Sequence, residues 1–155
     1  MAREAFSRGD LLLFVAVLAV AGAAVSAYLT YEWYAAFGSS VCDLNNYFNC
    51  SAVGQSAYSS FAGIPTATVG LAGFLILLVL AVGAFRGLER IGPWSVDRWL
   101  LVFASLGALV GLGLTLIEIF VIHAICIFCA LGFAIDLGIL TLAWRLSSAP
   151  LAAGA

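Results

Sequence analysis

The sequence has no lysine and few charged residues of any kind. Six arginines stand against eight acidic residues, and charged residues make up 9% of the chain while hydrophobic residues make up 65%. Soluble domains carry about 25% charged residues, so this composition excludes a water-soluble globule. The shortage of basic residues also excludes a nucleic-acid-binding surface. The length of 155 residues fits a single domain, residues 1–155.

Long apolar runs are abundant where charge is scarce. A run of about 20 apolar residues crosses the hydrocarbon of a bilayer, and four runs qualify: 11–31, 64–85, 99–117 and 119–144. The first run is too long for the apolar region of a signal peptide. The sequence therefore predicts an all-α integral membrane protein, a four-transmembrane-helix bundle with an extracytoplasmic loop and a short surface helix capping one end.

The arginines would gather on one side of such a bundle, in the two terminal tails and the middle loop. They are Arg3, Arg8, Arg86, Arg90, Arg98 and Arg145. By the positive-inside rule that side is cytoplasmic, which predicts a multi-pass protein of the cell (inner) membrane with both termini in the cytoplasm. All four cysteines would then be extracytoplasmic, in a compartment that permits disulfides.

The outer loop, roughly residues 32–63, carries the predicted surface helix. Val53, Ala57 and Phe61 recur at every fourth position with polar residues between them. This spacing is typical of an amphipathic helix that lies flat on a membrane surface.

Cys126 and Cys129 form a CxxC motif where the fourth span begins. Their spacing puts both sulfurs on one helical face within reach of a disulfide. Unpaired N–H groups and the helix dipole at a helix amino terminus favour a thiolate. The motif therefore indicates redox chemistry.

Cys42 and Cys50, in the loop, would by themselves suggest a structural disulfide. Beside a CxxC motif they favour a relay, in which Cys50 is better placed than Cys42 to exchange with Cys126. Four cysteines allow three pairings, and the sequence does not choose among them. Zinc is the competing use, but structural zinc sites bring two closely spaced pairs, so we expect no metal.

Two acidic residues fall within the predicted spans. Asp136 lies about 15 Å along the helix from Cys126 and shares the face of Cys129. We expect it to be protonated and bonded to another helix, with a proton relay as the alternative. Glu118, at the outer end of the third span, is expected to reach interfacial water, with a part in proton transfer as the alternative.

Taken together, these motifs resemble the vitamin K epoxide reductase family, and in particular its bacterial branch. The matching residues are Cys42, Cys50-Ser51-Ala52-Val53, Ser56, Gly63-Ile64-Pro65 and the CxxC motif at the start of the last span. The resemblance implies a membrane enzyme that oxidises a thioredoxin-like partner and reduces a quinone, menaquinone or ubiquinone, in support of disulfide bond formation.

The resemblance also implies roles for the four cysteines. Cys42 and Cys50 would be the shuttle pair, Cys126 would exchange with Cys50, and Cys129 would be the thiolate beside the quinone. The sequence shows no fused thioredoxin-like domain, so we expect a separate partner.

A quinone pocket would be formed by Ser56, Phe61, Thr66 and Phe133. Phe133 stands where vertebrate members carry a tyrosine, and it has no hydroxyl to donate.

Two alternatives stay open. One is a DsbB-type quinone reductase, although that family places its CxxC motif in the first outer loop. The other is a non-catalytic membrane scaffold held by two static disulfides. Quinone reduction driven by a dithiol would separate an enzyme from a scaffold.

Overall fold

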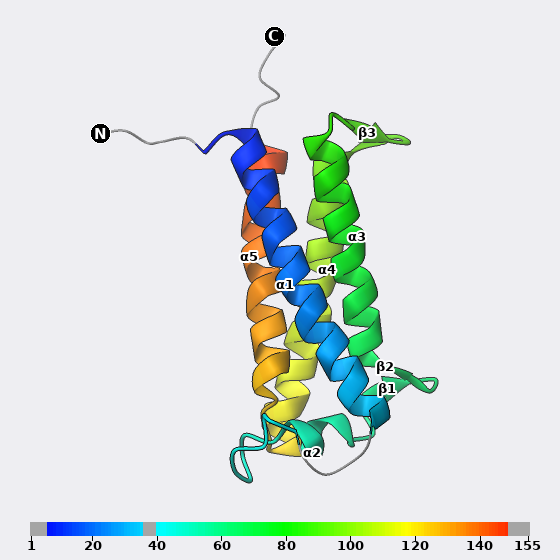
Figure 1. Ribbon diagram of the computed structural model, residues 1–155, viewed down its shortest axis with the longest axis vertical. Helices are drawn as coiled ribbons and strands as arrows, with labels where there is room; N and C mark the ends of the chain where they lie inside the picture. The colour runs from blue at the N-terminus through cyan, green and yellow to red at the C-terminus, as the bar shows by residue number, and fades with distance from the viewer. Residues whose placement is uncertain (1–5, 36–39, 149–155) are drawn as a thin grey trace, which may run out of the picture.

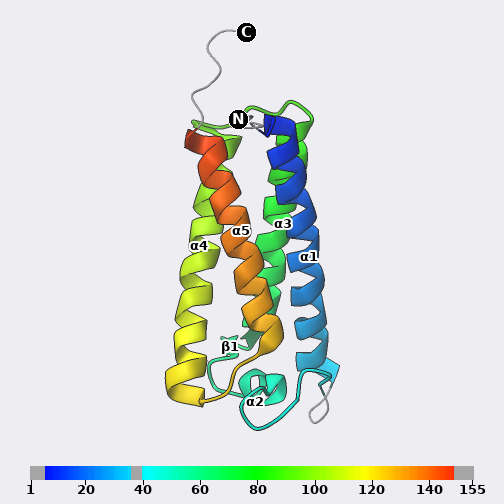
Figure 2. The same ribbon diagram turned by 90° about the vertical axis from the view of Figure 1, so that its left-hand side faces the viewer.

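The computed structural model describes residues 6–35 and 40–148. Its long helices are α1 (Arg8–Ala35), α3 (Thr66–Phe85), α4 (Val96–Ile117) and α5 (Ile127–Ser148). Helix α1 packs against α3 and α5, and α4 packs against the same two helices, which closes the bundle seen in Figures 1 and 2. All four helices are long and apolar enough to span a membrane. The predicted four-transmembrane-helix bundle is confirmed.

Apolar side chains point both into and out of the bundle. Val15, Leu100 and Ile139 are completely buried, whereas Val79 of α3 and Leu109 of α4 are 70% and 67% exposed. Outward apolar side chains suit a lipid environment. Between helices in lipid, small residues allow close packing.

The end of the bundle that carries the cysteines is capped by the loop between α1 and α3 (Figure 2). This loop contains the short helix α2 (Cys50–Gly54) and a hairpin of β1 (Ser60–Phe61) and β2 (Ile64–Pro65). The hairpin turns at Ala62 and Gly63, whose φ angles of 52° and 81° are left-handed. A second hairpin, β3 (Arg90–Ile91) with β4 (Trp94–Ser95), closes the opposite end.

The predicted surface helix is shorter than expected. Its amino terminus is capped by Asn49, whose side chain accepts the N–H of Ala52 at 2.8 Å. The helix ends at Gly54, a residue with low helix propensity. The positions of Ala57 and Phe61 therefore lie outside it, and Phe61 is 83% exposed in β1. The four-residue apolar spacing was misleading because a hairpin follows the helix.

The junction between α4 and α5 also differs from the prediction. Residues 119–122, predicted to begin the fourth span, instead end the third as part of the π-helix η1 (Glu118–Ile122). The chain leaves this helix at His123, which has a left-handed φ of 57°. Hydropathy did not reveal the break because the residues on both sides are apolar. Cys126 consequently lies directly before the first residue of α5.

The arginine-bearing end lies opposite the cysteines. Figure 1 shows the start of α1, the end of α5 and β3 at one end and α2 at the other. Five arginines belong to that first end, at the limits of the long helices or in β3: Arg8, Arg86, Arg90, Arg98 and Arg145. Arg3 lies outside the described residues. Arg8 also bonds Asp97 at 2.9 Å and so connects α1 with α4.

Candidate active site

The outer loop is docked onto the segment that precedes α5. The N–H of Ile125 donates to the carbonyl of Tyr47 at 2.7 Å, and the N–H of Asn49 donates to the carbonyl of Ile125 at 3.2 Å. The side chain of Asn45 shapes this part of the loop by accepting the N–H groups of Tyr47 and Phe48, both at 2.8 Å. These bonds place Cys50 beside Cys126.

The two loop cysteines form a disulfide, and the CxxC cysteines are free. Cys42 and Cys50 are bonded with their Cα atoms 5.6 Å apart, whereas Cys126 and Cys129 carry no disulfide. The sulfurs of Cys42, Cys50 and Cys126 all lie within 4.8 Å of one another, and all three residues are buried. A thiol is thus held next to a disulfide, as exchange requires.

Asp43 joins the two halves of the disulfide loop. Its carboxylate accepts the hydroxyl of Ser51 at 2.6 Å and the N–H groups of Ser51 and Ser40 at 3.0 and 3.2 Å. Partial burial acts to raise the pKa of Asp43, but these hydrogen bonds outweigh it and hold the pKa below its ordinary value. The ionised carboxylate therefore ties the segment of Cys42 to the start of α2.

The CxxC motif caps the amino terminus of α5. The sulfur of Cys126 accepts the N–H of Cys129 at 3.2 Å, and the carbonyl of Cys126 accepts the N–H of Ala130 at 2.9 Å. An N–H donor aimed at the sulfur, together with the helix dipole, stabilises negative charge there. The sequence prediction of a CxxC motif at a helix start agrees with this geometry.

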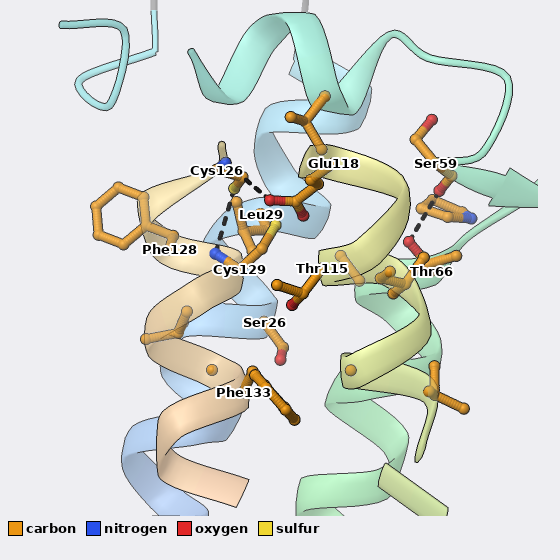
Figure 3. Close-up of a pocket in the computed structure, with 18 of the residues that line it drawn as sticks. Ser26, Leu29, Ser59, Thr66, Thr115, Glu118, Cys126, Phe128, Cys129 and Phe133 are labelled. Atoms are coloured by element: carbon orange, nitrogen blue, oxygen red, sulfur yellow. Dashed lines mark hydrogen bonds between the residues drawn. The ribbon is translucent and has the colours of Figure 1, made fainter. Parts of the chain in front are cut away.

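Glu118 does not reach interfacial water as expected. Its side chain is only 5% exposed, and Oε2 accepts the N–H of Cys126 at 3.1 Å (Figure 3). The expectation was wrong because the turn at His123 brings the chain back, so that the carboxyl meets a backbone N–H eight residues later.

A cavity of about 210 Å³ lies inside the bundle beneath α2. Cys50, Cys126 and Cys129 border it, and most of its wall is apolar. Three of the residues proposed for a quinone pocket also line it, namely Ser56, Thr66 and Phe133. Phe61 is not among the lining residues, because its side chain points into the surroundings from β1.

Other lining residues had not been identified from the sequence. They include Ser26 and Leu29 of α1 and Thr115 of α4, all labelled in Figure 3. Each is an ordinary residue within a membrane span, and no local pattern separates it from its neighbours. Only the packing of the helices brings these residues together.

Three hydroxyl groups at the outer rim of the cavity already donate to the backbone. Ser56 donates to the carbonyl of Val53 at 2.7 Å, Ser59 to that of Ser56 at 2.9 Å, and Thr66 to that of Ser59 at 3.1 Å. These bonds hold the segment between α2 and α3 in place.

Asp136 also lines the cavity, on α5. It is buried, as predicted, with 6% exposure. We expected Asp136 to bond to another helix, but its Oδ2 has no hydrogen-bond partner among the described residues. The facing residue of α4 is Gly107, which has no side chain to offer.

A buried thiol close to a disulfide can pass electrons between two cysteine pairs by exchange. In a bundle of membrane-spanning helices, this arrangement defines the class of membrane thiol–disulfide oxidoreductases. Residues 13–144, most of the chain, match the vitamin K epoxide reductase family, and the chain belongs to that family. Membership implies an oxidoreductase, in a family that is generally associated with quinones and thioredoxin-like partners.

Proposed function

We propose that this protein oxidises a thioredoxin-like partner on the extracytoplasmic side of the membrane and passes the electrons to a quinone, menaquinone or ubiquinone. Such a reaction supports disulfide bond formation. The observation that carries the proposal is the position of the Cys126 sulfur, within 4.8 Å of both sulfurs of the Cys42–Cys50 disulfide.

Electrons enter through the loop disulfide. A thiolate of the partner attacks the sulfur of Cys42, and Cys50 leaves as a thiolate. The second thiol of the partner then attacks the mixed disulfide, which releases the oxidised partner and leaves Cys42 and Cys50 reduced. Because Cys42 is only 4% exposed, the loop must open for a folded partner to reach it.

Electrons then pass from the loop to the CxxC pair. The Cys50 thiolate attacks the sulfur of Cys126 in a Cys126–Cys129 disulfide, and Cys129 leaves as a thiolate. Cys42 next attacks Cys50, which restores the loop disulfide and leaves the CxxC pair reduced. The bonded loop pair and the free CxxC pair of the structure correspond to this last arrangement.

The cavity beside Cys129 suits a quinone. Its wall is mostly apolar, it is bordered by Cys129, and it holds a buried carboxyl oxygen of Asp136 that has no hydrogen-bond partner within the described part of the chain. A bound quinone supplies an acceptor for two electrons and two protons. Cys129, one turn inside the bundle, would contact the quinone ring, while Cys126 stays within reach of the loop.

The distribution of arginines supports the proposed orientation. The arginine-bearing end is cytoplasmic by the positive-inside rule, so the cysteines face the compartment in which disulfides persist.

Purified full-length protein in lipid nanodiscs tests the proposal. With a reduced thioredoxin-like protein as donor and menadione as acceptor, the wild type should oxidise the donor and reduce menadione in equal amounts. Cys129→Ala should abolish both, and Thr141→Ala, an exposed position on α5, should leave both unchanged. Equal menadione reduction by the wild type and Cys129→Ala would contradict the proposal, and no reduction by the wild type would favour the static scaffold.

A further inference from the structure

The cavity contains an acid that the electron path does not use. Asp136 is 6% exposed, and its Oδ2 has no hydrogen-bond partner among the described residues. A buried polar atom without a partner is rare in folded proteins, since it loses its bonds to water and gains none. Such an atom on the wall of a cavity is suited to a ligand.

Asp136 and Cys129 face the same space from the same helix. Both line the cavity, and they are seven residues apart on α5, which is about two turns and about 10 Å along the axis. Their side chains therefore leave the helix on one face. Cys129 lies toward the outer end of the cavity and Asp136 toward its inner end.

The facing helix makes room for the carboxyl group. A Cβ atom on Gly107 of α4 would lie 2.8 Å from Oδ2 of Asp136, so only glycine leaves this space open. One turn further out, Gly111 gives similar room to the ring of Phe133. Neither glycine can bond to Asp136 through a side chain.

The other polar groups on the wall are poor proton donors or lie at the outer end. Five of these groups are serine or threonine hydroxyls, which are not acids: Ser26, Ser56, Ser59, Thr66 and Thr115. Three of them already donate to backbone carbonyls.

The other titratable lining groups are Glu118, Tyr58 and the cysteines. Glu118 already bonds Cys126, and the lining residues from α1 and α3 include no charged side chain.

We infer that Asp136 hydrogen-bonds the quinone oxygen farther from Cys129 and donates the proton that this oxygen takes up. The inference rests on the proposed function. An isolated charge within the membrane is costly, so Asp136 is in its neutral form, which carries a proton to give. The two opposite oxygens of a quinone ring are separated by about half of the axial distance between Cys129 and Asp136. A hydrogen bond from Asp136 to one oxygen and a contact between the Cys129 sulfur and the ring cover the remaining distance.

The transfer leaves the overall reaction balanced. Cys126 and Cys129 lose two electrons and two protons as the bond between their sulfurs forms. Two electrons and two protons convert the quinone to a hydroquinone. Asp136 supplies one of these protons from its O–H group to the farther oxygen, and the nearer oxygen takes one of the two protons that the CxxC thiols release. After the hydroquinone leaves, Asp136 regains a proton from those that the thiols release, so no net proton is gained or lost.

Two substitutions separate binding from proton donation. In Asp136→Asn the amide still donates a hydrogen bond but has no acidic proton, so kcat for ubiquinone-1 reduction by dithiothreitol should fall about 100-fold with little change in KM. In Asp136→Leu both functions are lost, so KM should rise as well. The matched control is Asp97→Asn, another buried carboxyl, which lies in the ion pair with Arg8 at the far end of the bundle and should leave kcat unchanged.

The experiment uses the full-length protein in nanodiscs, with reduction of the Cys42–Cys50 disulfide by dithiothreitol as a second readout. That step should be equally fast in all variants, because Asp136 is remote from the loop. A wild-type kcat in Asp136→Asn would overturn the proton donation, and a wild-type KM in Asp136→Leu would overturn the binding contact. If Asp136→Leu fails to fold, Asp136→Asn alone decides. A wild type that reduces neither ubiquinone-1 nor menadione would instead overturn the proposed function, and a wild type that reduces menadione alone is compared with the variants on menadione.

Discussion

The two CxxC sulfurs have different surroundings, which is the basis for the different roles proposed for them. Cys126 is 1% exposed and lies against the loop disulfide. Cys129 is partly buried, one turn further along α5, and borders the cavity. At the scale of single residues, these surroundings fit the proposed exchange of Cys126 with Cys50 and the proposed contact of Cys129 with a quinone.

Single-cysteine variants test this division. In Cys126→Ala the remaining Cys129 thiolate should produce a charge-transfer absorbance when menadione is added, because a thiolate in contact with the ring donates electron density to it. In Cys129→Ala no such band should form. Visible absorbance spectroscopy of the purified variants gives the answer, and a band seen with Cys129→Ala alone would reverse the two roles.

Asp43 should make the loop sensitive to acid. Its pKa in the folded loop is lowered by the donors from Ser51 and Ser40. The stabilisation is therefore complete above the ordinary aspartate pKa and is lost as the pH falls through the lower, folded value. Reduction of the Cys42–Cys50 disulfide by a phosphine reductant should accelerate as the pH falls below about 4.

Asp43→Asn provides the comparison for that measurement. The amide cannot accept three hydrogen bonds as a carboxylate does, so its disulfide should be reduced several-fold faster at neutral pH, with little further change on acidification. Equal rates and equal pH profiles for the two proteins would show that Asp43 does not hold the loop.

At the scale of helices, close packing of α1 on α3 depends on a small residue. A Cβ atom on Gly22 of α1 would overlap the ring of Phe74 on α3, and Phe74 is itself buried. The two helices meet here with ring against backbone, a type of contact that stabilises membrane bundles.

Gly22→Ala should therefore destabilise the bundle by about 1–3 kcal/mol, measured as a lower midpoint of thermal unfolding in detergent. Gly113→Ala on α4 is the control, because a Cβ atom there meets nothing within 4 Å. The control should be neutral or slightly stabilising, since alanine favours a helix over glycine. A similar midpoint for Gly22→Ala and the wild type would mean that Phe74 moves aside freely.

At the scale of the whole molecule, charge and cysteines occupy opposite ends. The described arginines lie at the end where α1 begins and α5 ends, and the disulfide and the CxxC motif lie at the end capped by α2 (Figure 1). By the positive-inside rule this polarity predicts that the arginine-bearing end is cytoplasmic and that the cysteines lie in the compartment where disulfides persist.

Labelling of new cysteines on a cysteine-free background tests the orientation. Val41→Cys, at a site that is 75% exposed, should react with an impermeant maleimide in intact cells. Glu89→Cys, in the loop between α3 and β3, should react only after the membrane is opened. Reaction of Glu89→Cys alone in intact cells would place the active site in the reducing cytoplasm.

The sequence by itself determined the number of spans and the location of the CxxC motif. Both are local properties. An apolar run in lipid must be helical, because its backbone finds no water to bond, and the spacing of Cys126 and Cys129 depends only on their positions along one helix. The separation of arginines from cysteines follows from the same four spans.

Tertiary structure alone decided how the site is assembled. The pairing of Cys42 with Cys50 and the contact of Glu118 with Cys126 each join residues eight positions apart across a turn. The approach of the Cys126 sulfur to the loop disulfide and the placing of Ser26 and Thr115 on one cavity wall join segments that are distant in sequence. No local pattern encodes such contacts. The left-handed turn at His123 and the early end of α2 at Gly54 were missed for a different reason, because apolar residues flank the turn on both sides and the four-residue apolar spacing continues past the end of the helix.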